Sequence, residues 1–288
     1  MGTASDLFFG LSAAFGYGTG DFLARGASHR VGYVRVLFYM EVVSLLVMLP
    51  LAVVFERDRW RPTSALEIVP ILAAVNVFAS LFLYRAIEYG VLSVVSPLIS
   101  SFPVVTAALA ILFLGDRPPL AAAAGIVAAL AGIVLISRSG AHPDNPPPKD
   151  ARVGLISAIL SFSGYGVFYF ALKYAVLDFG PITAVTLVRT AGIGILILAS
   201  VAGVARIGGL PGDVWPAIVA MGLLDTLGFI AYSVGIVAGS VAIIGTLSGL
   251  FSAVTVGLAA IFLRERLTRI QYAGMAAIFL GVVLMAVR

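Results

Sequence analysis

The chain has 288 residues, of which 61% are hydrophobic and only 11% charged, with a formal net charge of +4. Soluble domains carry about 25% charged residues, so this composition excludes them and indicates an integral membrane protein. Cysteine is absent, which excludes disulfides and thiolate chemistry, and the basic residues are spread without a run, so no nucleic-acid partner is expected.

Ten apolar segments follow one another between charged or Pro/Gly-rich breaks. A membrane-spanning helix needs about 20 mostly apolar residues, and lipid-exposed backbone must satisfy its own hydrogen bonds. The sequence therefore predicts an all-α integral membrane fold of ten transmembrane helices. Their expected ranges are 5–25, 32–55, 65–87, 91–114, 120–138, 151–174, 180–203, 213–236, 240–263 and 268–287.

The polar, proline-rich segment 139–150 is interpreted as a linker between two five-helix halves, 1–138 and 151–288, because its prolines cannot continue a helix. The halves repeat each other: Gly-Tyr-Gly at 16–18 recurs at offset 148, and Val105-Thr106 recurs at offset 149. Such constant offsets predict an internal duplication.

An odd number of helices in each half determines how the two copies are inserted. A five-helix unit begins and ends on opposite sides of the bilayer, so the second copy is expected upside down, as in the inverted repeats of secondary transporters. Lysine and arginine are more frequent in the loops opposite the termini, which favours both termini outside under the positive-inside rule.

Polar side chains recur every fourth residue on two symmetry-related helices, and this spacing keeps them on one helix face. The sixth helix carries Ser157, Ser161, Tyr165, Tyr169 and Lys173, and the first carries Tyr17, Asp21 and Arg25. Tyr17 and Tyr165 lie near the helix centres and are expected to line a substrate cavity. The alternative is an interfacial tyrosine belt with Lys173 and Arg25 reaching the head groups.

The third and eighth helices add further substrate-binding candidates. Asn76, Ser80 and Tyr84 step by four on one, and Asp225 and Tyr232 lie on the other. A carboxylate within a bilayer costs at least about 2.5 kcal/mol, so a midspan aspartate indicates a functional site. The alternative for Asp225 is a helix-to-helix hydrogen bond from its neutral form. Asp21 and Asp225 are the candidate proton carriers.

Two pairs of residues are candidates for coupling or gating, and the first pair, Glu41 and Arg189, are repeat partners at offset 148. Glu41 and Arg189 have opposite charges, and a structural ion pair is the first interpretation, a gate contact the second. Pro97 and Gly245 interrupt the fourth and ninth helices and are candidate hinges near a substrate site, or positions of close helix packing.

Several function classes lack their motifs. A nucleotide-binding loop, zinc-ligand spacing and a Gly-x-Ser-x-Gly elbow do not occur, so catalytic residues, metal and cofactors are not expected. The even spread of polar residues over both halves favours a pathway through the protein over a lipid-modifying enzyme. That enzyme and a lipid flippase are the alternatives from other classes. Nothing in the sequence specifies the oligomeric state.

Short motifs at matching places connect the chain with a known family. Phe-Leu-Gly-Asp-Arg at 113–117 and Phe-Leu-Arg-Glu-Arg at 262–266 follow the fourth helix of each half, and Gly-x6-Gly-Ile-Val-Leu and Gly-x6-Gly-Val-Val-Leu close the halves. With ten short-looped helices they resemble the drug/metabolite transporter superfamily, EamA type. Asp116 and Glu265 match its acidic loop position, although Asp replaces Glu in one half and Arg264 replaces Gly in the other.

The resemblance implies a multi-pass protein of the bacterial inner membrane that exports amino acids or related metabolites by alternating access. It also implies cytoplasmic termini, in conflict with the charge distribution. The tyrosines would cover an apolar or aromatic side chain, while Asn76, Ser80 and Ser248 bond the backbone groups of the small-molecule substrate. A proton-coupled drug or sugar transporter, or a uniporter, is the alternative.

Overall fold

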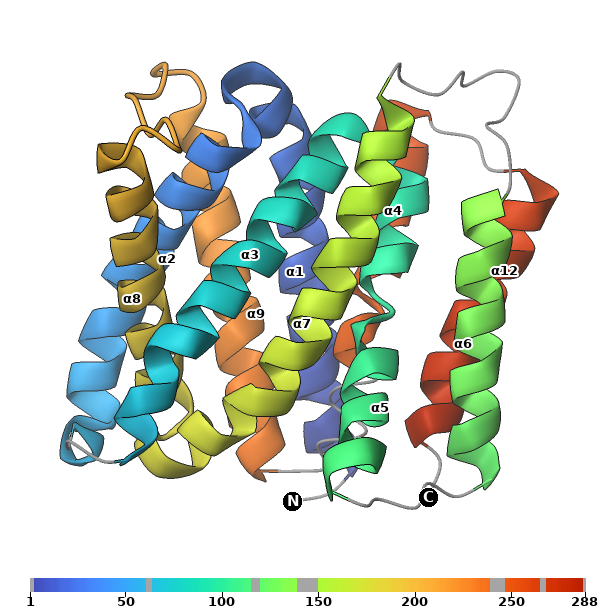
Figure 1. Ribbon diagram of the computed structural model, residues 1–288, viewed down its shortest axis with the longest axis horizontal. Coiled ribbons are helices and arrows are strands. Elements are labelled where there is room, and N and C mark those ends of the chain that lie inside the picture. Colours follow the sequence, from blue (N-terminus) through green and yellow to red (C-terminus); the bar gives the residue numbers. More distant parts are fainter. Residues whose placement is uncertain are drawn as a thin grey trace.

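The computed structural model describes residues 3–60, 64–114, 120–138, 150–238, 247–264 and 268–286, and all regular structure within these ranges is helical. The helices stand side by side in Figure 1. The first half contains α1 (Thr3–Val31), α2 (Tyr33–Phe55), the short 3-10 turns η1 (Arg57–Arg59) and η2 (Ser64–Ile68), α3 (Val69–Tyr89), α4 (Leu92–Ile99), α5 (Phe102–Leu114) and α6 (Leu120–Arg138). The second contains α7 (Ala151–Phe179), α8 (Pro181–Val201), α9 (Trp215–Ala238), α11 (Phe251–Leu258), the π-helical η3 (Ala259–Leu263) and α12 (Arg269–Ala286).

Five helical stretches are long and apolar enough to cross a membrane: Tyr33–Phe55, Ile68–Tyr89, Ala151–Phe179, Pro181–Val201 and Trp215–Gly235. Large apolar side chains on them face outward, for example Leu177 and Leu198, which are 75% and 70% exposed. Such surfaces are stable in lipid, so the predicted helical multi-pass membrane class is confirmed for the described residues. The number of ten spans stays a prediction.

The predicted single span 91–114 is instead two helices, α4 and α5, which meet at Ser100 and Ser101. Both serine hydroxyls donate to the carbonyl oxygen of Pro97, at 2.8 and 3.1 Å. The Ser101 amide donates to the carbonyl oxygen of Leu98. Side chains thus satisfy the backbone where the regular ladder ends. Gly245, the other predicted hinge, lies outside the described residues, as does segment 139–149 of the predicted linker.

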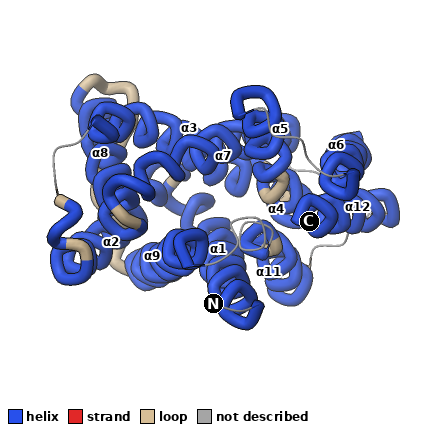
Figure 2. The backbone as a smooth tube through the Cα atoms, turned by 90° about the horizontal axis from the view of Figure 1, so that it is seen from below, coloured by secondary structure: helices blue, strands red, loops and turns tan. Residues whose placement is uncertain are grey.

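Helices of the two halves pack in matching pairs. α1 lies against α9 and α11, and α7 lies correspondingly against α3 and α5. α2 contacts α9 as α8 contacts α3, while α6 and α12 pack on each other beside the remaining helices (Figure 2). In Figure 1, α1 rises from the lower edge, whereas α7 descends from the upper edge, so these two corresponding helices of the repeats run in opposite directions.

The repeated sequence motifs make the same close contact twice. Thr255 donates through Oγ1 to the Gly18 carbonyl at 3.0 Å, and Thr106 donates to the Gly166 carbonyl at 3.0 Å. A Cβ on Gly18 would lie 2.4 Å from the carbonyl oxygen of Phe251. The glycines are therefore required by the approach of α11 to α1 and of α5 to α7, which brings aromatic residues together at the centre.

The α1–α2 and α7–α8 turns also match. Gly32 and Gly180 both have φ of +85°, a left-handed conformation that favours glycine. After each turn a glutamate from elsewhere in the chain accepts hydrogen bonds from the first free amides. Glu88 of α3 accepts from Tyr33 at 2.8 Å, and Glu56, just after α2, accepts from Ile182 and Thr183, the latter at 2.7 Å. These carboxylates cap α2 and α8 and hold the helix ends in place.

We predict that Gly18→Ala destabilises the protein by about 1–3 kcal/mol, because the new methyl group forces α1 and α11 apart. Gly26→Ala is the matched control on the same helix, since a Cβ there meets no atom within 4 Å. Thermal unfolding of both variants in detergent measures the effect. Equal melting temperatures for the two variants would contradict the proposed close contact.

Candidate functional site

A central cavity lies where α1, α2, α3, α7, α8 and α9 meet the inner ends of α4, α5 and α11. Its volume is about 50 Å³, which is room for a few water molecules but not for an amino acid. Both halves contribute to its walls. Any larger ligand therefore requires that side chains or helices move apart.

Most of the residues singled out in the sequence reach this cavity. The lining includes the predicted substrate-binding residues Tyr17, Asn76, Ser80, Tyr84, Tyr165, Tyr169 and Asp225, together with Asp21 and Arg189. Tyr232 lies behind Tyr169, with ring centroids 5.1 Å apart, and Ser248 is buried away from the lining. Pro97 lies in α4 outside the lining, and Glu41 reaches the site through Arg189.

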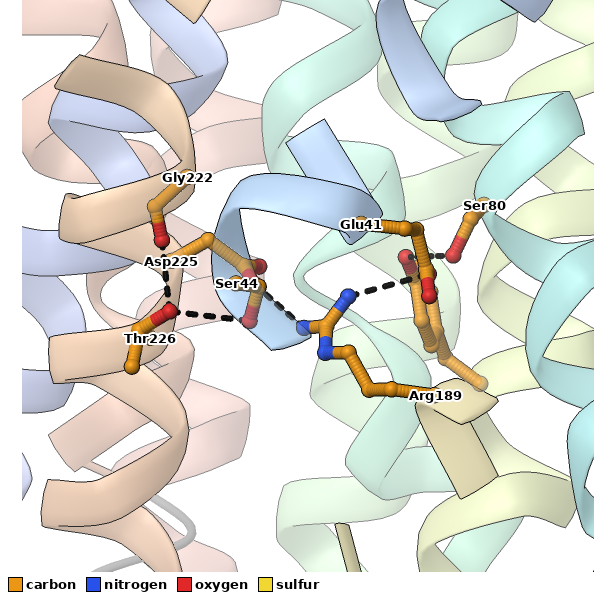
Figure 3. Close-up of polar contacts among 8 residues, drawn as sticks. Glu41, Ser44, Ser80, Arg189, Gly222, Asp225 and Thr226 are labelled. Carbon is orange, nitrogen blue, oxygen red and sulfur yellow. Dashed lines mark hydrogen bonds and ion pairs between the residues drawn. The ribbon is translucent and has the colours of Figure 1, made fainter. Parts of the chain in front are cut away.

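Arg189 of α8 is held between two carboxylates from different helices (Figure 3). Its Nη1 lies 2.9 Å from Oε1 of Glu41 on α2, and its Nη2 donates to Oδ2 of Asp225 on α9. The guanidinium also lies over the Phe229 ring, 4.7 Å from the ring centroid. Because Arg189 is 3% exposed, its charge needs these partners to remain buried.

The ion pair between Glu41 and Arg189 was the first interpretation of the sequence, whereas the participation of Asp225 was not foreseen. The sequence contained a signal for it, since three carboxylates and one arginine lie within predicted membrane-spanning segments. Their spacing along the chain, however, does not reveal which carboxylates face the arginine. The tertiary structure brings α2, α8 and α9 together and makes the three side chains one cluster.

Hydroxyl groups extend this polar centre across helices. Thr226 donates through Oγ1 to the Gly222 carbonyl at 2.6 Å and lies 2.8 Å from the Ser44 hydroxyl, which links α9 to α2. On the other side the hydroxyls of Ser80 and Tyr165 are 2.9 Å apart and join α3 to α7 (Figure 3). These bonds leave the polar residues in defined positions around the cavity.

Aromatic rings form the complementary apolar wall. Tyr169 stacks on Phe102 with centroids 4.7 Å apart, and Tyr17 meets Phe229 edge to face at 5.4 Å and Phe251 at 6.5 Å. The phenylalanines were not selected as binding residues from the sequence, because apolar side chains are frequent throughout a membrane helix. Their contribution follows from the glycine contacts that bring α5 and α11 inward.

The described residues hold no group of three or more His, Cys, Asp or Glu side chains that could bind a metal ion. The acidic loop positions Asp116 and Glu265 lie outside these residues. The described residues of the site make ion pairs, hydrogen bonds and aromatic contacts.

Comparison with known proteins identifies the family. The model of the EamA-like transporter family matches residues 5–138 and 152–287, which cover nearly the whole chain. The chain belongs to the EamA-like transporter family. As a member it has the two-repeat architecture and is a multi-pass membrane transporter of small molecules, in agreement with the resemblance found in its sequence motifs.

Two further comparisons are consistent with this family. The Methanocaldococcus jannaschii protein named Uncharacterized protein MJ1333.1 is 32% identical over 133 residues, which are 46% of this chain and 96% of that protein. A crystal structure aligns over 98% of this chain and 96% of its own, with a TM-score of 0.69 and 16% identity. At that identity the likeness shows the fold alone.

We predict that Arg189→Met destabilises the protein by about 3–5 kcal/mol, because it leaves Glu41 and Asp225 as unpaired buried charges. Arg30→Ala is the matched control: Arg30 pairs with Asp213 through side chains that are 58% and 57% exposed, so its loss costs at most about 1 kcal/mol. Chemical unfolding in detergent compares them. A smaller loss for Arg189→Met than for Arg30→Ala would refute the structural role of the cluster.

Proposed function

We propose that this EamA-like transporter is a secondary transporter that exports small amphipathic metabolites, with aromatic and hydrophobic amino acids as the favoured substrates. The observation that carries the proposal is a central cavity in which an aromatic wall faces charged and amide side chains. A substrate with an apolar side chain and a polar amino-acid group matches both surfaces.

The aromatic wall is suited to the substrate's side chain. Tyr169, Phe102 and Phe229 present ring faces and edges, and aromatic pairs contribute about 0.5–1.5 kcal/mol each beyond their buried area. Asn76 and Ser80 supply the nearby amide and hydroxyl groups for the backbone end of the substrate. Ser248, predicted to share that task, has no part in the proposal because it lies away from the lining.

Alternating access follows from the small volume of the cavity and from the interrupted helix beside it. Because the cavity holds only a few waters, binding and release require another arrangement of the helices. The α4–α5 junction next to Phe102 gives the first half a place to bend, with Pro97 as the hinge. The cluster of Glu41, Arg189 and Asp225 joins the two halves and would act as a gate when their contacts change.

The proposed location is the inner membrane of a bacterium, with Asp21 and Asp225 as the carriers if transport is coupled to protons. A second candidate function, efflux of cationic drugs, is favoured by one observation: the carboxylates of Asp21, Glu41 and Asp225 outnumber the one arginine of the site. This excess attracts cations or protons.

Uptake of labelled phenylalanine and leucine into proteoliposomes that contain only this protein tests the proposal. Uptake above protein-free liposomes is expected, and its absence for all amino acids would overturn the amino-acid assignment. Uptake that needs an imposed pH gradient indicates proton coupling, whereas uptake that a proton ionophore leaves unchanged indicates a uniporter.

The aromatic wall predicts the effect of Tyr169→Ala. We expect the KM for phenylalanine to rise about tenfold, because the substrate ring loses a stacking partner worth about 1.4 kcal/mol. Tyr174→Ala is the matched control on α7, since Tyr174 is 43% exposed on the outer surface. If Tyr174→Ala raised the KM as much, substrate would not bind at the central cavity.

A further inference from the structure

The carboxylates of the site differ in whether a cation faces them. Arg189 has its two terminal nitrogens engaged, one by Glu41 and one by Asp225. Its Nε is also buried and makes no hydrogen bond to the described residues. Two carboxylates thus face one guanidinium, so the cluster carries an excess of negative charge and does not favour the carboxylate of a substrate.

Asp21, unlike Glu41 and Asp225, does not face Arg189. It lines the same cavity and is 8% exposed, and within the part of the chain that the structure describes no hydrogen bond or ion pair reaches its carboxylate. Arg25, one turn further along α1, donates instead to the carbonyl oxygens of Ile87 and Gly90 at the end of α3. A buried carboxylate without a cation is costly, so this position favours a cationic ligand.

The surroundings of Asp21 have the chemistry of an amine site. Tyr17 lies one turn before it on α1 and contacts Phe229 and Phe251 edge to face. The repeat partner of Asp21 is Tyr169, at offset 148, which also lines the cavity. One half thus supplies the charge and the other the aromatic ring, and a cation between a carboxylate and aromatic faces is stabilised by both.

We propose that Asp21, and not Asp225, anchors the ammonium group of the substrate, and that the site does not bind the substrate's carboxylate. The inference rests on the proposed function of this cavity. It predicts that arylalkylamines, which carry the ring and the ammonium group only, bind at least as tightly as the corresponding amino acids. Among the described residues, Asp21 is the carboxyl group of the cavity that has no arginine partner, so it identifies the ammonium group as the polar feature that the protein recognises.

Three ligands with the same phenyl ring separate the contribution of the ammonium group from that of the carboxylate. We would titrate the full-length protein in detergent with L-phenylalanine, 2-phenylethylamine and 3-phenylpropionate by calorimetry. The amine is expected to bind with a Kd equal to or below that of phenylalanine, and the propionate at least tenfold more weakly than the amine. Propionate binding as tight as amine binding would overturn the inference.

The outcomes distinguish the inference from the proposed function. If phenylalanine and propionate bind and the amine does not, amino-acid transport stands and the role of Asp21 fails. If the amine binds and phenylalanine does not, the role of Asp21 stands and the amino-acid assignment fails. If none of the three binds, both are wrong.

Variants assign the effect to one carboxylate. Asp21→Asn is expected to weaken amine binding about 10–100-fold, the contribution of a hydrogen bond to a charged group. Asp21→Glu should retain most of the affinity, and 2-phenylethanol, a neutral analogue, should bind Asp21→Asn and the unaltered protein equally, which shows that the cavity is intact. Asp225→Asn tests the other carboxylate of the lining, and a larger loss of amine affinity there than in Asp21→Asn would assign the anchor to Asp225.

Discussion

The structure depends on the neutralisation of one buried guanidinium. Arg189 lies near the centre of α8 and is 3% exposed, and its charge is stable there because Glu41 and Asp225 face it. These partners come from α2 and α9, so one interaction draws three helices from both halves to a common point. The cavity lies beside this cluster, and its remaining polar groups are positioned relative to it.

The two halves place their helices around this centre in the same way, and the residues that differ between matched positions give the site its chemistry. Gly18 and Gly166 receive Thr255 and Thr106 in the same way, which sets the approach of the inner helices in both halves. At other matched positions the residue types differ: Glu41 corresponds to Arg189, Asn76 to Asp225, and Asp21 to Tyr169. A duplicated fold thereby acquires a site with opposite charges and an aromatic wall. The Methanocaldococcus jannaschii relative aligns over 133 residues, which are 96% of its own length. That length is close to the length of one repeat of this chain.

Periodicity predicted much of the site because it reports which residues share a helix face. Tyr165 and Tyr169, one turn apart, reach the cavity as their spacing predicts, and so do Asn76, Ser80 and Tyr84 on α3. Tyr232 follows Asp225 by seven residues, which keeps it close to the same helix face, yet it is not among the residues that line the cavity. Its ring instead contacts Tyr169, with centroids 5.1 Å apart. Phe102 and Phe251 could not be distinguished from other apolar residues without knowledge of which helices approach the centre.

The sequence by itself determined the helical membrane class, the two-repeat organisation and the family, because these depend on hydrophobic length, constant offsets and short motifs. It also indicated that Glu41 and Arg189 would pair, since isolated charges in a bilayer are unstable. Only the tertiary structure decided that Asp225 shares the arginine and that Asp21 does not. Pairing depends on the distance between side chains of different helices, and that distance is set by helix crossing and glycine contacts, which no periodicity within one segment encodes.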